Sequence, residues 1–185
     1  FETETSGFIG GKIDRKRKVP ATTLLRAFGI EKDQQIKELF KDVDVGEVKY
    51  IEETLKKDST HNQAEAMVEV YQRLRPGDVA TPDTARELIE NMFFNFERYD
   101  LSKVGRWRMG QRLPKLAQQK RGTDVEPEIT VKDRVLKPED VVDVLREVIR
   151  LNNDPDGKPD QIDHLGNRRV RTLDELLQNR IRVGL

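Results

Sequence analysis

The sequence contains no cysteine and only two histidines, His61 and His164. Without cysteine there is no disulfide scaffold, no thiol nucleophile and no Cys-ligated metal. Two histidines alone cannot form a zinc site with three histidine ligands. Aromatic residues make up only 6% of the 185 residues and include a single Trp, which is too few for an extended platform of base-stacking side chains.

Long apolar runs and familiar catalytic motifs are missing as well. No stretch approaches the roughly 20 apolar residues that a membrane span needs. The first five residues lack the basic and apolar regions of a signal peptide, so we expect a cytoplasmic protein with no membrane partner. There is no Walker-type loop, no G-x-S-x-G and no H-E-x-x-H. We therefore expect no complete enzyme active site within this chain.

The net charge is zero, with 34 Lys and Arg against 34 Asp and Glu, but the charges are segregated along the chain. Residues 31–58 hold nine acids against six lysines, whereas residues 101–122 hold seven bases and no acid. An uneven distribution attracts a polyanion locally even where the total charge does not. The charge pattern is therefore compatible with nucleic-acid binding.

The apolar spacing predicts an α+β fold that is mainly helical, with a small antiparallel hairpin. We expect the hairpin in residues 1–19, with Ser6-Gly7 and Gly10-Gly11 in its turn. An irregular basic segment is expected over 95–122 and a small strand pair over 123–136. The helical pattern covers residues 20–28, 31–41, 47–57, 62–74, 81–93 and 138–151.

One loop divides the chain. Residues 152–160, NNDPDGKPD, carry the composition of a flexible linker. The predicted organisation is a compact domain over 1–151, the linker, and a C-terminal segment over 161–185. In that segment, Thr172 followed by Glu175 is a cap pair that predicts a last short helix.

Three clusters are candidates for binding. The first reads Ile13-Asp14-Arg15-Lys16-Arg17-Lys18. On a single strand, Arg15 and Arg17 would share one face, and Lys16 and Lys18 would share the other with Asp14. Such a strand either contacts phosphates or is a solvated edge strand whose lysines prevent aggregation.

The other two clusters lie further along the chain. Residues 98–108 interleave aromatic side chains with arginines, which suits single-stranded nucleic acid but also a Trp half-buried by its own loop. In residues 163–171, the turn signal Gly166-Asn167 would bring Asp163 and Arg168 together. A carboxylate facing a guanidinium is either a structural ion pair or a pair that reads an extruded guanine.

Three strings in these regions resemble one family. They are IDRKRKVPATTLLRAFG, RLRPGDVATPDTARELIENMFFNFERYDLSKVGR and IDHLGNRRVRTLDELLQNRIRVGL. They resemble, in the same order, the β subunit of bacterial DNA-directed RNA polymerase, a nucleotidyltransferase. The resemblance implies that residues 1–151 form the β lobe (β2), that residues 161–185 return as a strand and short helix toward the protrusion (β1), and that the chain is a piece of a longer subunit.

The resemblance also implies a role. The family's lobe is a non-catalytic wall of the main DNA channel, which faces downstream DNA and the non-template strand. A pocket in it captures an extruded non-template guanine, and its acidic and basic members match Asp163 and Arg168. The other residues that the resemblance places near DNA are Arg15, Lys16, Arg17 and Lys18 near the fork of the bubble, Arg75 in the gate loop and Arg98 near the non-template strand.

Cofactors and partners follow from the same resemblance. The family's magnesium is held by another subunit, so we expect no cofactor here and no activity from this chain alone. Expected partners are DNA, the β′, α and ω subunits, sigma factor and transcription regulators. Two alternatives remain open: a stand-alone helical protein-interaction domain that uses the charged helices of residues 31–57, and a free single-strand binder.

Overall fold

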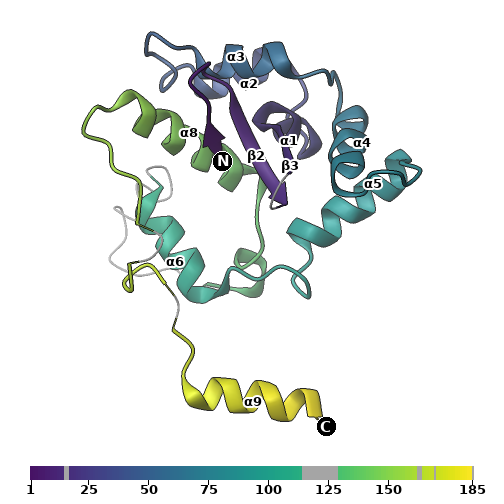
Figure 1. Cartoon of the computed structure of the whole chain (residues 1–185), viewed down its shortest axis with the longest axis vertical. Helices are drawn as coiled ribbons and strands as arrows, with labels where there is room; N and C mark the ends of the chain where they lie inside the picture. The colour runs from purple at the N-terminus through teal and green to yellow at the C-terminus, as the bar shows by residue number, and fades with distance from the viewer. Residues whose placement is uncertain (15–16, 114–128, 162–163, 169, 185) are drawn as a thin grey trace. The chain divides into compact units, whose positions relative to one another are not determined.

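The structure is a computed structural model that describes residues 1–14, 17–113, 129–161, 164–168 and 170–184. The chain divides into two compact units, Phe1–Pro155 and Asp156–Leu185 (Figure 1). The first unit combines a small antiparallel sheet with a set of helices. The predicted α+β class, mainly helical, is therefore confirmed.

The sheet has three strands in the order β1-β2-β3, namely β1 (Glu2–Thr3), β2 (Ile9–Asp14) and β3 (Arg17–Pro20). Both pairings are antiparallel, and Asp14 lies opposite Arg17. The prediction that residues 13–18 form one continuous strand is therefore wrong. The placement of Gly10 and Gly11 in a turn is also wrong, because both lie inside β2.

The glycine in β2 has a packing reason. A Cβ atom at Gly11 would lie 2.5 Å from Cδ1 of Leu24. The missing side chain therefore lets α1 pack closely against the sheet, which is a known use of glycine within strands. The turn before β2 is made at Gly7, as predicted, and its φ of +85° suits a residue without a Cβ.

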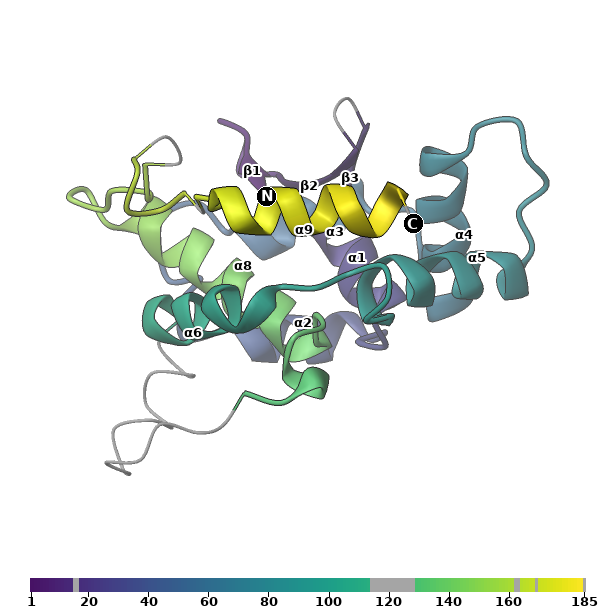
Figure 2. The ribbon, with the colours of Figure 1, turned by 90° about the horizontal axis from the view of Figure 1, so that it is seen from below.

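Most helices of the first unit begin and end near the predicted residues. Those with apolar faces are α1 (Ala21–Ala27), α2 (Asp33–Phe40), α3 (Tyr50–Lys57), α4 (Gln63–Leu74), α5 (Pro82–Ile89) and α8 (Pro138–Asn153). A π-helical turn, η1 (Glu90–Phe94), extends α5 directly. In both views α4 and α5 lie at one end of this unit (Figure 1, Figure 2).

Local capping sets two of the helix starts as predicted. The Asn62 side chain accepts a hydrogen bond from the Glu65 N–H at 2.9 Å. Thr81 and Thr84 form a reciprocal capping box, with Pro82 as the first residue of α5. Both arrangements satisfy main-chain N–H groups that the first turn of a helix leaves without partners.

The segment predicted to be irregular contains a helix, α6 (Ser102–Arg112), so that prediction is wrong. The helix has few apolar residues, and its apolar spacing therefore gave no signal. It is held beside α8 by ion pairs instead, among them Arg106 with Asp140. The predicted strand pair over 123–136 lies partly outside the described residues. Its described part, 129–136, forms a 3-10 turn, η2 (Val131–Asp133), and no strand.

The apolar core consists of two clusters that meet at α1, all of whose residues are buried. Leu25 and Ala21 belong to the first cluster. Leu24 and Ala27 belong to the second. The first cluster contains Ile9, Ala21, Leu25, Ile36, Phe40, Ile51, Val141, Val142, Leu145 and Ile149. The second contains Val19, Leu24, Ala27, Ala66, Met67, Val70, Tyr71, Ala85 and Ile89.

The second unit carries a turn at residues 164–168 and a 12-residue helix, α9 (Leu173–Gly184). The predicted C-terminal helix is therefore present. Among the described residues of this unit, no β-strand precedes it. One side of α9 exposes apolar side chains, those of Leu173, Leu176, Leu177 and Ile181.

Candidate nucleic-acid interface

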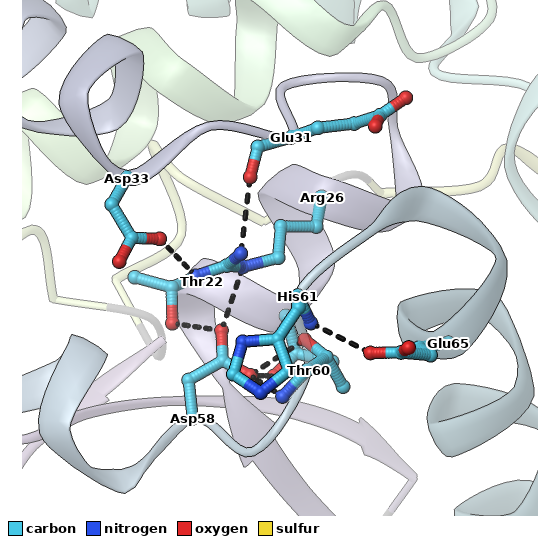
Figure 3. Close-up of polar contacts among 9 residues, drawn as sticks. Thr22, Arg26, Glu31, Asp33, Asp58, Thr60, His61 and Glu65 are labelled. Carbon is cyan, nitrogen blue, oxygen red and sulfur yellow. Dashed lines mark hydrogen bonds and ion pairs between the residues drawn. The ribbon is translucent and has the colours of Figure 1, made fainter.

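A buried carboxylate, Asp58, is at the centre of a polar network between α1 and the segment that follows α3 (Figure 3). Asp58 follows α3, and its side chain is fully buried. It accepts hydrogen bonds from the hydroxyl groups of Thr22 at 2.6 Å, Thr23 at 3.0 Å and Thr60 at 2.6 Å. The Nε of Arg26 lies 3.3 Å away. These contacts tie α1 to the segment that joins α3 to α4.

The same hydrogen bonds set the ionisation of Asp58. Burial raises the pKa of this carboxyl group, because water no longer solvates its charge. Hydrogen bonds from Thr22, Thr60 and Thr23 together lower the pKa by more, so that it ends below its ordinary value. Asp58 is therefore a charged structural group rather than a general acid.

Arg26 extends this network to the start of α2. Its Nη1 donates to the main-chain carbonyl oxygen of Glu31 at 3.0 Å, and its Nη2 pairs with the carboxylate of Asp33. The Arg26 side chain is almost fully buried. It is therefore committed to internal contacts and is not available to a ligand.

Arg17, a predicted DNA contact, binds the end of α4. Its Nη1 donates to the main-chain carbonyl oxygen of Arg73 at 2.7 Å and to that of Leu74. The last carbonyl groups of a helix have no partner within it, and a cation there also interacts favourably with the helix dipole. The structure thus gives Arg17 a capping role that joins β3 to the segment beginning at Arg75.

Lys18 lies on β3 opposite Lys12 on β2, and both ammonium groups contact Glu2 on β1. The Lys18 Nζ is 2.6 Å from the Glu2 carboxylate. Hydrogen bonds from Lys12 and Lys18 lower the pKa of Glu2 to about 2, and the hydrogen bond to Glu2 raises the pKa of Lys18. Lys18 thus lies beside Lys12, and both side chains face Glu2.

Arg75 and Arg98 present their guanidinium groups to solvent. Arg75 follows the last residue of α4, and its guanidinium carbon lies 5.9 Å from the ring centroid of Tyr71. Arg98 follows η1, where its N–H donates to the Asn95 carbonyl oxygen at 3.0 Å. Neither arginine forms an ion pair with another described residue.

Arg168 is exposed in the turn of the second unit. His164 shapes this turn, because its Nδ1 accepts a hydrogen bond from the Gly166 N–H at 3.1 Å and its carbonyl oxygen accepts one from the Asn167 N–H at 2.8 Å. A structural role for His164 fits this geometry. Asp163, like Arg15 and Lys16, lies outside the described residues, so its approach to Arg168 stays a prediction.

One buried ion pair was not anticipated from the sequence. Arg106 on α6 donates from Nη1 to the Asp140 carboxylate at 2.6 Å, and both side chains are at most 10% exposed. Arg106 is one of the seven bases in residues 101–122 whose charge suggests an attraction for a polyanion. The signal that could have revealed the pair is on α8, where Asp140, Asp143 and Glu147 recur at helical spacing within an apolar pattern.

The described part of the chain contains neither a metal-binding cluster nor a membrane-spanning helix. No group of three or more His, Asp or Glu residues there is arranged to hold a metal ion. No helix there has the length and apolar character needed to cross a membrane.

Residues 1–171 match the family model described as RNA polymerase Rpb2, domain 2, and the chain belongs to this family.

The curated relatives that the chain matches share one name, DNA-directed RNA polymerase subunit beta. The chain is 44% identical to the DNA-directed RNA polymerase subunit beta of Chloroflexus aggregans, 43% to that of Dehalococcoides mccartyi and 40% to that of Syntrophomonas wolfei. Each alignment covers the whole of this chain. The chain spans only 14–16% of the length of these relatives.

Proposed function

We propose that this chain forms a non-catalytic wall of the main DNA channel of a bacterial RNA polymerase, where it contacts downstream DNA and the non-template strand. The observation that carries the proposal is the exposure of Arg75 and Arg98 without an acidic partner among the described residues. These are two of the positions that the family resemblance assigns to DNA. Family membership over residues 1–171 supports the same role.

The physical character of the surface fits a wall along which DNA slides. Contacts to phosphate position a strand without reading its sequence, so they can be exchanged as the strand moves. Isolated exposed arginines on a chain of zero net charge supply contacts of this kind without holding DNA tightly. Nucleotide addition and its magnesium belong, in this proposal, to the remainder of the polymerase.

Protein contacts form the second part of the proposal. The apolar side chains of Leu176, Leu177 and Ile181 on α9 are 44–60% exposed. Exposed apolar side chains grouped on one helix face are typical of surfaces that contact protein. We place these contacts with the other polymerase subunits β′, α and ω or with sigma factor, rather than with a partner of a stand-alone adaptor domain.

The test measures the salt dependence of open complexes formed by polymerase whose complete β subunit carries Arg75→Ala or Arg98→Ala. Each lost phosphate contact should reduce the slope of log K against log salt by up to about one. Arg73→Ala is the matched control, because Arg73 is an exposed arginine at the same helix end that already pairs with Glu69 at 2.9 Å. Slopes unchanged by both variants would overturn the DNA-contact role.

A further inference from the structure

The exposed arginine that follows η1 stands on a backbone held in one conformation. Arg98 ends the turn at residues 96–98, which lies between η1 and α6. Its main-chain N–H donates to the carbonyl oxygen of Asn95 at 3.0 Å. The next N–H, that of Tyr99, donates to the same oxygen at 2.8 Å. One residue, Asn95, therefore accepts from the main chain on either side of the Arg98 Cα atom.

Asn95 shapes this turn with its side chain as well. Its Oδ1 accepts a hydrogen bond from the N–H of Glu97 at 2.9 Å. Its Nδ2 donates to the side-chain oxygen of Asn91 in η1 at 3.0 Å. An asparagine that accepts from the N–H two residues further on forms an Asx turn, which fixes the backbone locally. Asn95 therefore links the turn that carries Arg98 to the helix before it.

Aromatic rings hold η1 itself in place. Phe93 and Phe94 are consecutive, yet both rings meet the ring of Phe28 edge to face, with centroids 5.4 and 5.3 Å away. Phe28 follows the last residue of α1 and packs against both apolar clusters. Edge-to-face aromatic pairs are favourable beyond the apolar area that they bury. The helix that carries Asn91 is therefore tied to the core of the first unit.

Tyr99 holds the other end of the turn. Its ring centroid lies 6.5 Å from that of Phe93, and its side chain is half-buried. Burial raises the pKa of the Tyr99 hydroxyl group, and the nearby charges of Arg106 and Asp140 act on the same pKa in opposite directions. The Tyr99 side chain thus reaches toward the buried ion pair between α6 and α8. The turn is anchored on both sides, while the side chain of Arg98 remains exposed.

The turn also keeps Arg98 apart from the acid next to it. Glu97 directly precedes Arg98, and both side chains are exposed. Although the structure describes both residues, no ion pair joins them. The N–H of Glu97 is the group that the Asn95 side chain holds. The fixed turn therefore leaves the guanidinium group of Arg98 available to an anion outside the chain.

We propose that Asn95 is a positioning residue, which fixes the backbone under Arg98 for contact with a DNA strand. Fixing the backbone of one residue has an entropic cost equivalent to a factor of about 5–30 in an equilibrium constant. In this chain the turn is ordered on folding, so the phosphate contact does not bear that cost. The inference rests on the proposed function for its ligand, and it adds a residue that the family resemblance does not place near DNA.

The test uses polymerase whose complete β subunit carries the changes, with the stability of open complexes measured over a salt series. Asn95→Ala removes both side-chain hydrogen bonds without altering charge. It should weaken open complexes about 5- to 30-fold. The slope against log salt should stay that of the parent, because the guanidinium group can still reach a phosphate. Arg98→Ala should lower both quantities, and Asn95→Ser should recover most of the affinity, because a hydroxyl group can accept the same N–H.

A double variant distinguishes positioning from simple support of the fold. If Asn95 acts through Arg98, adding Asn95→Ala to Arg98→Ala should weaken open complexes no further. Asn62→Ala is the matched control, because it removes an asparagine Oδ1 that accepts a main-chain N–H at 2.9 Å at the start of α4. That control should leave the open complexes unchanged. Fully additive losses in the double variant would mean that Asn95 supports only the fold, and would overturn the inference.

The outcomes separate this inference from the proposed function. Open complexes weakened by Arg98→Ala but not by Asn95→Ala overturn the positioning role and leave the channel role standing. Unchanged affinity and slope in Arg98→Ala overturn the proposed contact of Arg98 with DNA. Hydrogen exchange of the Arg98 and Tyr99 amides then decides on Asn95 alone. Exchange accelerated by Asn95→Ala would show that only the ligand was wrong, whereas unaltered exchange would overturn the positioning as well.

Discussion

The guanidinium group of Arg17 donates a hydrogen bond to the main-chain carbonyl oxygen of Arg73 across 2.7 Å. The two residues are 56 positions apart in the sequence, yet this contact joins the strand β3 to the last turn of α4. Arg75 lies two residues beyond the accepting carbonyl. Arg17 therefore acts on the geometry of a proposed DNA contact from a distance.

Replacing Arg17 should loosen the end of α4. Arg17→Met removes charge-assisted hydrogen bonds and should lower the free energy of unfolding by about 1.5–3 kcal/mol. Hydrogen exchange of the amides from Arg75 to Asp78 should accelerate. Arg17→Lys is the matched variant, because it keeps one cation able to reach a carbonyl oxygen and should restore part of the protection. Unaltered exchange in Arg17→Met would contradict the capping role.

Stability should depend on Asp58 at acid pH. The pKa of this carboxyl group is lower in the folded chain than its ordinary value of 3.8. A group of this kind contributes stability above its unfolded pKa and loses that contribution as the pH falls through the folded value. Urea unfolding measured between pH 5 and pH 2 should show this loss, and Asp58→Asn should flatten it.

The control for this pH series is Asp83→Asn, because Asp83 is exposed on α5. That variant should follow the parent chain. If Asp58→Asn kept the full acid dependence of the parent, other carboxylates would have to be responsible, and the role given to Asp58 would be wrong.

The buried pair of Arg106 and Asp140 gives a third prediction. Arg106→Met leaves the Asp140 carboxylate buried without its partner, which should cost about 3–5 kcal/mol of stability. The double variant Arg106→Met with Asp140→Leu should recover part of this loss, since no unpaired charge remains. Chemical unfolding of the two single variants and the double variant measures the coupling energy between Arg106 and Asp140. If the losses in unfolding free energy were purely additive, the two side chains would not interact.

The fourth prediction concerns base preference in the complete polymerase. Arg168→Ala should weaken the preference for a non-template guanine by about 1–3 kcal/mol, the range of one good bidentate contact. Competition between guanine-containing and thymine-containing bubbles measures this difference. Arg171→Ala, an exposed arginine of the same unit, is the control. If the Arg168→Ala enzyme kept its full preference for guanine, Arg168 would not be part of the guanine pocket.

The parts of the fold that the sequence predicted are those specified locally. Asn62 and Thr81 lie at helix starts because their side chains satisfy N–H groups three residues away. Gly29, with φ of +101°, ends α1 where the chain adopts a left-handed conformation. Each of these signals acts within one helical turn, so the residues alone were sufficient.

The parts that were missed depend on distant residues. The helix α6 is fixed by acids on α8 that are distant in the sequence. Arg106 and its partner Asp140, for example, are 34 positions apart. Gly11 lies within a strand because Leu24 needs the space that a side chain would occupy. The residues next to Arg17 in the sequence do not indicate that its side chain contacts the end of α4.

The candidate site shows the same division. The sequence singled out Arg75, Arg98 and Arg168, and the structure leaves all three exposed. It could not separate those exposed cations from Arg106, which is equally basic but buried. Only the positions of the opposing carboxylates decide which arginines remain available to DNA.

The helix α1 gives this domain its mechanical character. Its residues supply side chains to both apolar clusters, and none of its residues is exposed. Because both clusters pack on the same helix, no solvated layer at α1 separates them. A displacement of one cluster would therefore be transmitted through α1 to the packing of the other.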